Sequence, residues 1–208
     1  MSAADFFPER ITFPSLRAAA ATCRGCPLWK LGTQTVFGEG ARRPRLMIVG
    51  EQPGDQEDRE GHPFVGPSGL LLDRALEAAG IERGDAYVTN AVKHFKWVPD
   101  SKGGKRRIHA KPSTKEVRAC HPWLDAEIHV LQPKVILALG ATAAQSLFGP
   151  ATKVIAQRGR QLKTELAEMA FVTVHPSAVL RAPGALERKQ AEKEFVADLK
   201  KVARYLRA

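Results

Sequence analysis

The chain has 208 residues, of which 44% are hydrophobic and 26% are charged. This composition is that of a soluble globular protein, and the length suits one α/β domain rather than two. No apolar run is long enough to span a membrane, and the N-terminus lacks the layout of a signal peptide. We therefore predict one cytoplasmic domain over residues 1–208, with no membrane partner and, by default, a monomer. The net charge of +10 argues against an acidic partner and favours a polyanion such as nucleic acid.

Two basic clusters carry much of this charge. The first is Arg42-Arg43-Pro44-Arg45, and the second runs from Lys102 to Lys111. Either cluster alone is consistent with an ordinary solvated face. We expect both to lie near the carboxyl edge of the predicted sheet, where together they would favour nucleic-acid binding.

The N-terminal region predicts a short helix over residues 15–22, capped at Ser15, that leads to Cys23 and Cys26. Three cysteines in a cytoplasmic chain do not indicate disulfides. Two thiolates two residues apart in a glycine-containing turn can bind one metal or cluster. A redox pair has the same spacing, but the βα pattern expected around such a pair is missing here.

Four apolar segments predict the core strands. Leu46–Val49 is continuously apolar, which is typical of a strand buried on both faces of a parallel sheet. The others and the intervening helices follow in order: strands at 86–92, 134–139 and 170–174, and helices at 70–79, 113–131, 141–148 and 185–206. Gly80 suits the end of the first of these helices, and Ser113 with Glu116 suits the start of the next. The sequence thus predicts a three-layer α/β/α sandwich with a central, mainly parallel four-stranded sheet.

Polar side chains follow three of these strands, namely Glu51, Asn90 and His175. Ligands of open α/β sheets bind at the carboxyl ends of the strands, so these residues are candidates for chemistry. The alternative for the acidic turn after residue 50 is that its acids cap the next helix. Asn90 offers a donor and an acceptor suited to the edge of a base. His175 precedes a proline that restricts it, and its ring can donate a hydrogen bond to an oxygen gaining charge.

Two loops complete the candidate site. The loop at 61–69 is rich in proline and glycine and carries Phe64, which either stacks on a planar base or fills the core. The basic loop at about 97–112 is long for a compact domain, which favours a functional role. Within it, phosphate is the expected target of Arg106 and Arg107, and from the loop alone His109 is a further DNA contact.

Four segments in this order resemble the motifs of the family-4 uracil-DNA glycosylases: 50–55 (GEQPGD), 63–66 (PFVG), 89–93 (TNAVK) and 175–181 (HPSAVLR). The similarity spans nearly the whole chain and includes the paired cysteines. It implies an enzyme that excises uracil from DNA, single-stranded or with the base flipped out. Phe64 would stack on uracil, Asn90 would read its polar edge, and His175 would stabilise charge on the departing base. The resemblance also implies two sets of contacts: uracil-binding Gln52, Asp55, Phe64, Asn90 and His175, and DNA-binding Lys105, Arg106, Arg107, Ser177 and Arg181.

That family holds its cluster with four cysteines, whereas this chain has three. His94 stands where the third cysteine usually lies, and imidazole can replace thiolate on iron. We predict a structural 4Fe–4S cluster held by Cys23, Cys26, His94 and Cys120. A zinc site has the same ligand count and stays an alternative, as does His121 for the fourth ligand.

Gln52, in place of the usual alanine, and the extra loop 105–109 resemble the UdgX branch, whose members become covalently joined to the DNA. The resemblance implies that His109 captures C1′ of the abasic site in a single turnover, with Glu51 accepting its proton or polarising its ring. Two alternatives stay open. One is a conventional hydrolytic glycosylase, and the other is a non-catalytic iron–sulfur protein that binds damaged DNA.

Overall fold

The fold is taken from a computed structural model, which describes residues 1–101, 104 and 106–207. Its centre is a six-stranded sheet with β2, β3, β6 and β8 parallel and a short antiparallel strand at each edge. In spatial order the strands are β1 (Glu39–Gly40), β3 (Ala86–Asn90), β2 (Leu46–Gly50), β6 (Val135–Leu139), β8 (Met169–Thr173) and β7 (Gln161–Leu162). The prediction of four parallel core strands is confirmed. The two edge strands are only two residues long and leave no periodic signal in the sequence.

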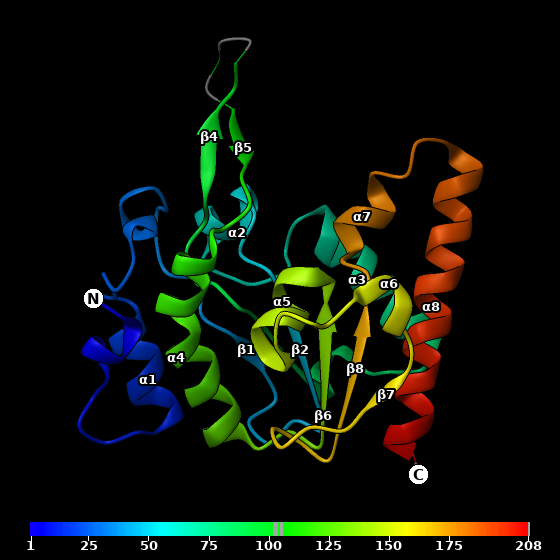
Figure 1. The fold of residues 1–208 in the computed structure, drawn as a ribbon, viewed down its shortest axis with the longest axis horizontal. Helices are drawn as coiled ribbons and strands as arrows, with labels where there is room; N and C mark the ends of the chain where they lie inside the picture. Colours follow the sequence, from blue (N-terminus) through cyan, green and yellow to red (C-terminus); the bar gives the residue numbers. More distant parts are fainter. Residues whose placement is uncertain (102–103, 105, 208) are drawn as a thin grey trace.

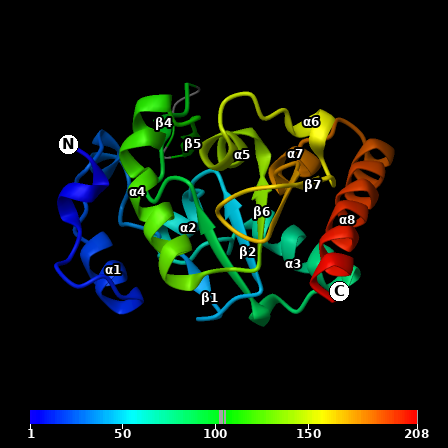
Figure 2. The same ribbon diagram turned by 60° about the horizontal axis from the view of Figure 1, so that its bottom comes forward.

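Helices cover both faces of this sheet, which gives the predicted α/β/α sandwich (Figures 1 and 2). One apolar cluster packs α1 and α4 against one face, and a second packs α3 and α8 against the other. Strand β2 supplies both clusters, because Met47 and Val49 face one layer while Leu46 and Ile48 face the other. The helices are α1 (Phe13–Ala20), α2 (Asp55–Glu60), α3 (Pro67–Ala79), α4 (Thr114–Leu131), α5 (Gly140–Phe148), α6 (Val154–Gln157), α7 (Pro176–Leu180) and α8 (Ala185–Arg207), with 3-10 turns at Ala3–Phe6, Pro27–Lys30 and Arg83–Asp85.

Capping residues set the helix ends. Ser113 and Glu116 form the expected capping box of α4, and Gly80 ends α3 with a left-handed φ of 72°. The start of α1 differs from the prediction, since Thr12 caps the helix and Ser15 is the third helical residue of the same capping box. Ser15 was therefore a correct capping signal placed at the wrong position.

The basic loop at 97–112 is more ordered than predicted. It contains an antiparallel hairpin of β4 (Trp97–Pro99) and β5 (Arg107–His109), in which Trp97 pairs with His109. The hairpin projects from the carboxyl edge of the main sheet (Figure 1). Lys105 lies outside the described residues, so its predicted DNA contact stays a prediction.

The first basic cluster is placed differently from our expectation. Residues 42–45 precede Leu46, the first residue of β2, and therefore lie at the amino end of that strand. The Arg42 guanidinium sits 3.8 Å from the centre of the Phe13 ring, and Arg45 donates to the carbonyl of Leu206. The expectation that this cluster shares the carboxyl edge with the second one was wrong, because a run before a parallel strand lies at the opposite edge.

A fully buried ion pair underlies the end of β3. Lys93 Nζ donates to Glu127 of α4 at 2.5 Å, and neither side chain is exposed. The same ammonium donates to Thr89 Oγ1 and to the carbonyl oxygen of Asn90. Glu127 also accepts from the Tyr87 hydroxyl at 2.7 Å. The pair thus fixes the turn that follows Asn90.

Within the described part of the chain, none of the helices combines the length and apolar character that a membrane span requires.

Candidate functional site

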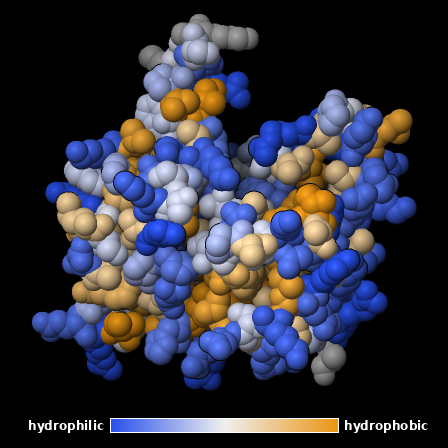
Figure 3. Space-filling view, viewed as in Figure 1, coloured by the Kyte–Doolittle hydropathy of each residue, from blue (hydrophilic) through white to orange (hydrophobic). Residues whose placement is uncertain are grey.

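A large pocket opens at the carboxyl edge of the sheet. It has a volume of about 1060 Å³, at the upper end of small-ligand sites and large enough for more than a single base. Its lining includes the three predicted strand-end residues Glu51, Asn90 and His175, together with Phe64 and His109. The space-filling view shows this edge hollowed between the hairpin and the α7 side of the molecule (Figure 3).

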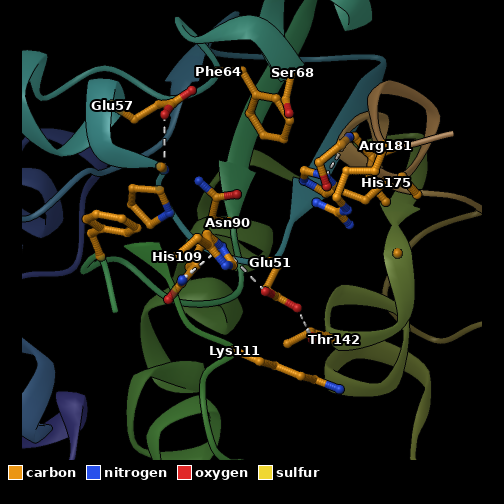
Figure 4. Close-up of a pocket in the computed structure, with 18 of the residues that line it drawn as sticks. Glu51, Glu57, Phe64, Ser68, Asn90, His109, Lys111, Thr142, His175 and Arg181 are labelled. Atoms are coloured by element: carbon orange, nitrogen blue, oxygen red, sulfur yellow. Dashed lines mark hydrogen bonds and ion pairs between the residues drawn. The ribbon is translucent and has the colours of Figure 1, made fainter. Parts of the chain in front are cut away.

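Glu51 lies between two elements (Figure 4). The hydroxyl of Thr142, on α5, donates to Glu51 Oε2, and the other oxygen, Oε1, lies 3.7 Å from His109 Nε2. The carboxylate thus faces both the pocket and the histidine on the hairpin. The helix-capping alternative applies to a neighbouring acid, because Glu57 accepts from the backbone N–H groups of Gly54 and Gly66 at 3.0 and 2.9 Å.

Gln52 binds the base of the hairpin. Its Oε1 accepts from the N–H of Lys96, and its Nε2 donates to the carbonyl oxygens of Lys96 and Ala110 at 3.2 and 3.0 Å. These backbone contacts fix which side of the amide carries the NH₂ group. That NH₂ lies 2.9 Å from His109 Nε2, so Nε2 faces a donor and presents its lone pair. The Gln52 amide is thus engaged with the hairpin. Its predicted contact with uracil stays a prediction.

His109 is held as a neutral ring. Burial is the main cause that lowers the pKa of His109 below its usual value, and the charge of Arg181 lowers it further. Glu51 acts in the opposite direction and raises the pKa. The lowered pKa favours the neutral ring, in which Nε2 carries a lone pair rather than a proton.

Asn90 and Phe64 form the wall of the pocket nearest the sheet. Asn90 Oδ1 is buried and has no hydrogen-bond partner among the described residues. Phe64 is 7% exposed and has a positive φ of 58°, a costly conformation for an aromatic residue. Gly50 permits this packing, since a Cβ at that position would overlap the Asn90 amide and the Phe64 ring. Phe64 therefore both fills the core and lines the pocket.

His175 has a defined tautomer. Its Nδ1 accepts from the backbone N–H of Ser177 at 3.2 Å and lies 2.9 Å from the Ser177 hydroxyl. The ring proton of the neutral form is therefore on Nε2. Burial lowers the pKa of His175 to about 4, with smaller contributions from the nearby His109 and Arg181, so the ring is neutral at pH 7. Ser177, predicted to contact DNA, here orients this histidine.

Arg107 has an internal role that the sequence did not indicate. It donates to Asp55, and to Asp58 Oδ2 at 2.6 Å. Its guanidinium also lies 5.3 Å from the centre of the Phe95 ring and 5.8 Å from that of Trp97. The side chain is 13% exposed, so it ties the hairpin to α2 rather than projecting toward solvent. Asp55, predicted to bind uracil, is one of its anchors.

The remaining predicted DNA contacts lie around the opening of the pocket. Arg106 and Arg181 are exposed and line it, as does Lys111, the last residue of the second basic cluster. Their positive charge borders the cavity on the hairpin side and the α7 side. This border suits a phosphate backbone.

The three cysteines are buried and free. Burial raises the pKa of Cys26, and the nearby Cys23 raises it further. Burial is the main cause that raises the pKa of Cys120, to about 12. Two sulfurs accept hydrogen bonds, Cys23 from the Trp123 indole at 3.2 Å and Cys120 from the backbone N–H of Lys93 at 3.2 Å. Buried thiols with N–H donors suit a cluster, whose sulfurs accept such bonds.

The histidine candidates differ in their partners. His94 is 5% exposed, and its Nε2 lies 3.0 Å from the Thr35 hydroxyl, which leaves Nδ1 as the nitrogen for a metal. Both ring nitrogens of His121 are engaged, Nδ1 with Ser146 and Nε2 with Asp125. In the part of the chain that the structure describes, no three His, Cys, Asp or Glu side chains converge on a single-ion site.

Comparison with known proteins agrees with this geometry. Residues 37–200 match the Uracil DNA glycosylase superfamily. The chain is 34% identical to the type-4 uracil-DNA glycosylase of Sulfurisphaera tokodaii, over 86% of this chain and 80% of that protein. It is 39% identical to the type-4 enzyme of Pyrobaculum aerophilum, over 77% and 81% of the two chains. The chain therefore belongs to the uracil-DNA glycosylase superfamily.

A solved structure supports the same fold. The crystal structure of wild-type Pedobacter heparinus SMUG2 aligns with a TM-score of 0.50, covering 78% of this chain and 77% of that one at 11% identity. The predicted fold class is thus confirmed by an independent structure.

Proposed function

We propose that this protein excises uracil from DNA and then becomes covalently joined, through His109 Nε2, to C1′ of the resulting abasic site. Membership of the superfamily and the similarity to type-4 enzymes support the excision step. The observation that carries the second step is the position of His109 Nε2, which faces the Gln52 NH₂ at 2.9 Å and Glu51 Oε1 at 3.7 Å. Nε2 thus carries a lone pair beside a carboxylate in the pocket, and capture would exchange its contact with the Gln52 NH₂ for the bond to carbon.

In the excision step, the uracil ring stacks on Phe64. The unpartnered Oδ1 of Asn90 accepts the N3–H of the base, and the Asn90 NH₂ donates to a carbonyl oxygen. The bond between C1′ and uracil N1 breaks, and its electron pair leaves with the base. His175 Nε2–H donates to the uracil oxygen that gains charge, as a neutral donor whose tautomer Ser177 fixes.

In the capture step, the cationic C1′ lies within reach of both Glu51 Oε1 and His109 Nε2. The carboxylate stabilises the positive charge of this carbon, and the Nε2 lone pair forms the new C–N bond. The alkylated ring then loses its Nδ1 proton to water. This differs from our expectation that Glu51 accepts that proton, because Glu51 Oε1 faces Nε2, the nitrogen that bonds to carbon.

We further propose that Cys23, Cys26, His94 and Cys120 hold a 4Fe–4S cluster. When bound, such a cluster supplies a covalent link between segments distant in sequence. In this chain it would join the segment after α1 to α4 and to the turn that begins at Asn90. Its role would be structural, because these ligands do not line the pocket.

A conventional hydrolytic glycosylase is the second candidate, and Glu51 carries it. A carboxylate in this position can orient water toward C1′ as well as stabilise its charge. The two mechanisms share the excision step and differ only in what attacks the carbon.

The test mixes the purified protein with a uracil-containing single-stranded oligonucleotide. Free uracil is quantified by chromatography, and the DNA is run on a denaturing gel after boiling. We expect released uracil and a shifted band that His109→Ala abolishes. His62→Ala is the matched control, since its ring is exposed, bonds Glu39 and does not line the pocket. Alkali-labile DNA without a shifted band would establish hydrolysis, and intact DNA would leave only a DNA-binding role.

A further inference from the structure

Thr142 is a residue of the pocket that the sequence did not mark. It is the third residue of α5, is 8% exposed and donates its hydroxyl to Glu51 Oε2. We infer that Thr142 is a positioning residue that holds the Glu51 carboxylate so that its free oxygen, Oε1, is directed at the reacting carbon. This inference rests on the proposed function and adds to it a residue that touches neither base nor sugar.

The Thr142 hydroxyl joins two elements that meet at the pocket. It donates from the first turn of α5 to the turn that follows β2. Figure 4 shows Glu51 between Thr142 and His109, with one oxygen directed to each.

The electrostatics of the same turn act in the same sense. A hydrogen bond to a carboxylate is charge-assisted, and the amino end of a helix favours a nearby anion. Gly140, Ala141 and Thr142 all line the pocket, so the start of α5 borders the Glu51 carboxylate. Both effects stabilise an ionised Glu51 in one orientation.

The same pocket contains cations that could compete for the carboxylate. Lys111 and Arg181 line the same pocket and can attract a free carboxylate. The Glu51 side chain is 22% exposed, so it has room to turn. Without the Thr142 hydroxyl, the carboxylate would divide its time between these cations and C1′, and stabilisation of the cationic carbon would fall.

The experiment compares Thr142→Val with Thr142→Ser at saturating DNA, under single-turnover conditions. Valine keeps the shape of the side chain and removes the hydroxyl, whereas serine keeps the hydroxyl. We expect valine to slow uracil release and adduct formation about tenfold, the loss of one hydrogen bond to a charged group, without weakening DNA binding. Serine should restore most of the rate. Thr152→Val is the matched control, since Thr152 is also buried, lies beyond the end of α5 and is outside the pocket lining.

A double-mutant cycle separates positioning from packing. If Thr142 acts through Glu51, Thr142→Val should change the rate little in a Glu51→Gln background. Equal rates for Thr142→Val and wild type would overturn the inference, as would a serine variant as slow as the valine variant. A melting temperature for each variant shows whether it is folded. If Thr142→Val is unfolded, the rate of Thr142→Ser and the double-mutant cycle test the inference. A wild-type protein that releases no uracil would instead refute the proposed function, and the inference would fall with it.

Discussion

The pocket is built from two regions that are held in different ways. Glu51, Asn90 and His175 follow strands of the main sheet, where backbone pairing sets their spacing. For example, Gly50 pairs with Asn90 in the parallel register, and Ala91 N–H donates to the Gly50 carbonyl at 2.9 Å. His109 instead stands on a two-stranded hairpin outside that sheet. Its position depends on side-chain contacts made by Arg107 and Gln52.

This difference assigns the two proposed steps to separate parts of the molecule. Residues that would break the glycosidic bond belong to the sheet, which the two apolar layers hold rigid. The residue that would capture the carbon belongs to an appended element. Substitutions that disturb the sheet should therefore impair both steps. Substitutions that remove the contacts between the hairpin and α2 should impair capture alone.

Removal of Glu127 should have the largest effect, because it breaks the support beneath Asn90. Glu127→Ala leaves the Lys93 ammonium buried without a counter-charge. We expect a loss of about 3–5 kcal/mol in the free energy of unfolding, measured by urea denaturation. Asp73→Ala, which removes an exposed pair with Arg83, should cost below about 1 kcal/mol. Equal stabilities of the two variants would contradict the structural role of the buried pair.

Loss of the hairpin anchor should separate the two steps. In Arg107→Ala the hairpin loses its contacts with Asp55 and Asp58, and we expect adduct formation to slow about a hundredfold through misplacement of His109. Uracil release should change little. The comparison is His175→Ala, which should slow release itself by about tenfold to a thousandfold. If Arg107→Ala reduced the rates of both steps equally, the assignment of capture to the hairpin and excision to the sheet would be wrong.

The smallest expected effect concerns pH. A protonated His109 has no free lone pair on Nε2, so adduct formation should fall as the pH decreases through its lowered pKa. Arg181 helps to lower that pKa, and Arg181→Gln should therefore move the acid limb of the rate to higher pH. Glu51→Gln should move it to lower pH, because Glu51 raises the pKa. The position of the acid limb in rates of adduct formation between pH 4 and 8, normalised to each variant's own plateau, would test both signs, and shifts in the same direction would refute this account.

Local patterns in the sequence were sufficient for the sheet and its strand-end residues. The continuous apolar run at Leu46–Val49 predicted a strand buried on both faces, and Glu51, Asn90 and His175 line one pocket because parallel strands end at one edge. The capping box at Ser113 was equally local. These predictions needed no knowledge of long-range packing.

Long-range contacts were not predictable in the same way. Thr142 carries no motif of its own, and the motif that contains Lys93 does not indicate its partner. Their partners Glu51 and Glu127 lie far away in sequence. We predicted that Arg107 contacts phosphate because its neighbours in the loop are basic. In the structure it forms ion pairs with two aspartates of α2. The side-chain pattern of a loop cannot reveal which cation is turned inward.

The way the hairpin joins the domain has a consequence for how such a protein can be altered. Its two strands leave and re-enter at one point, where Ala110 N–H donates to the Lys96 carbonyl at 3.0 Å. A shorter connection can therefore bridge this point without disturbing β3 or α4. Under the proposed function, a protein without the hairpin would lack His109 and could not bond to the abasic site. It would be released after each excision and could act again.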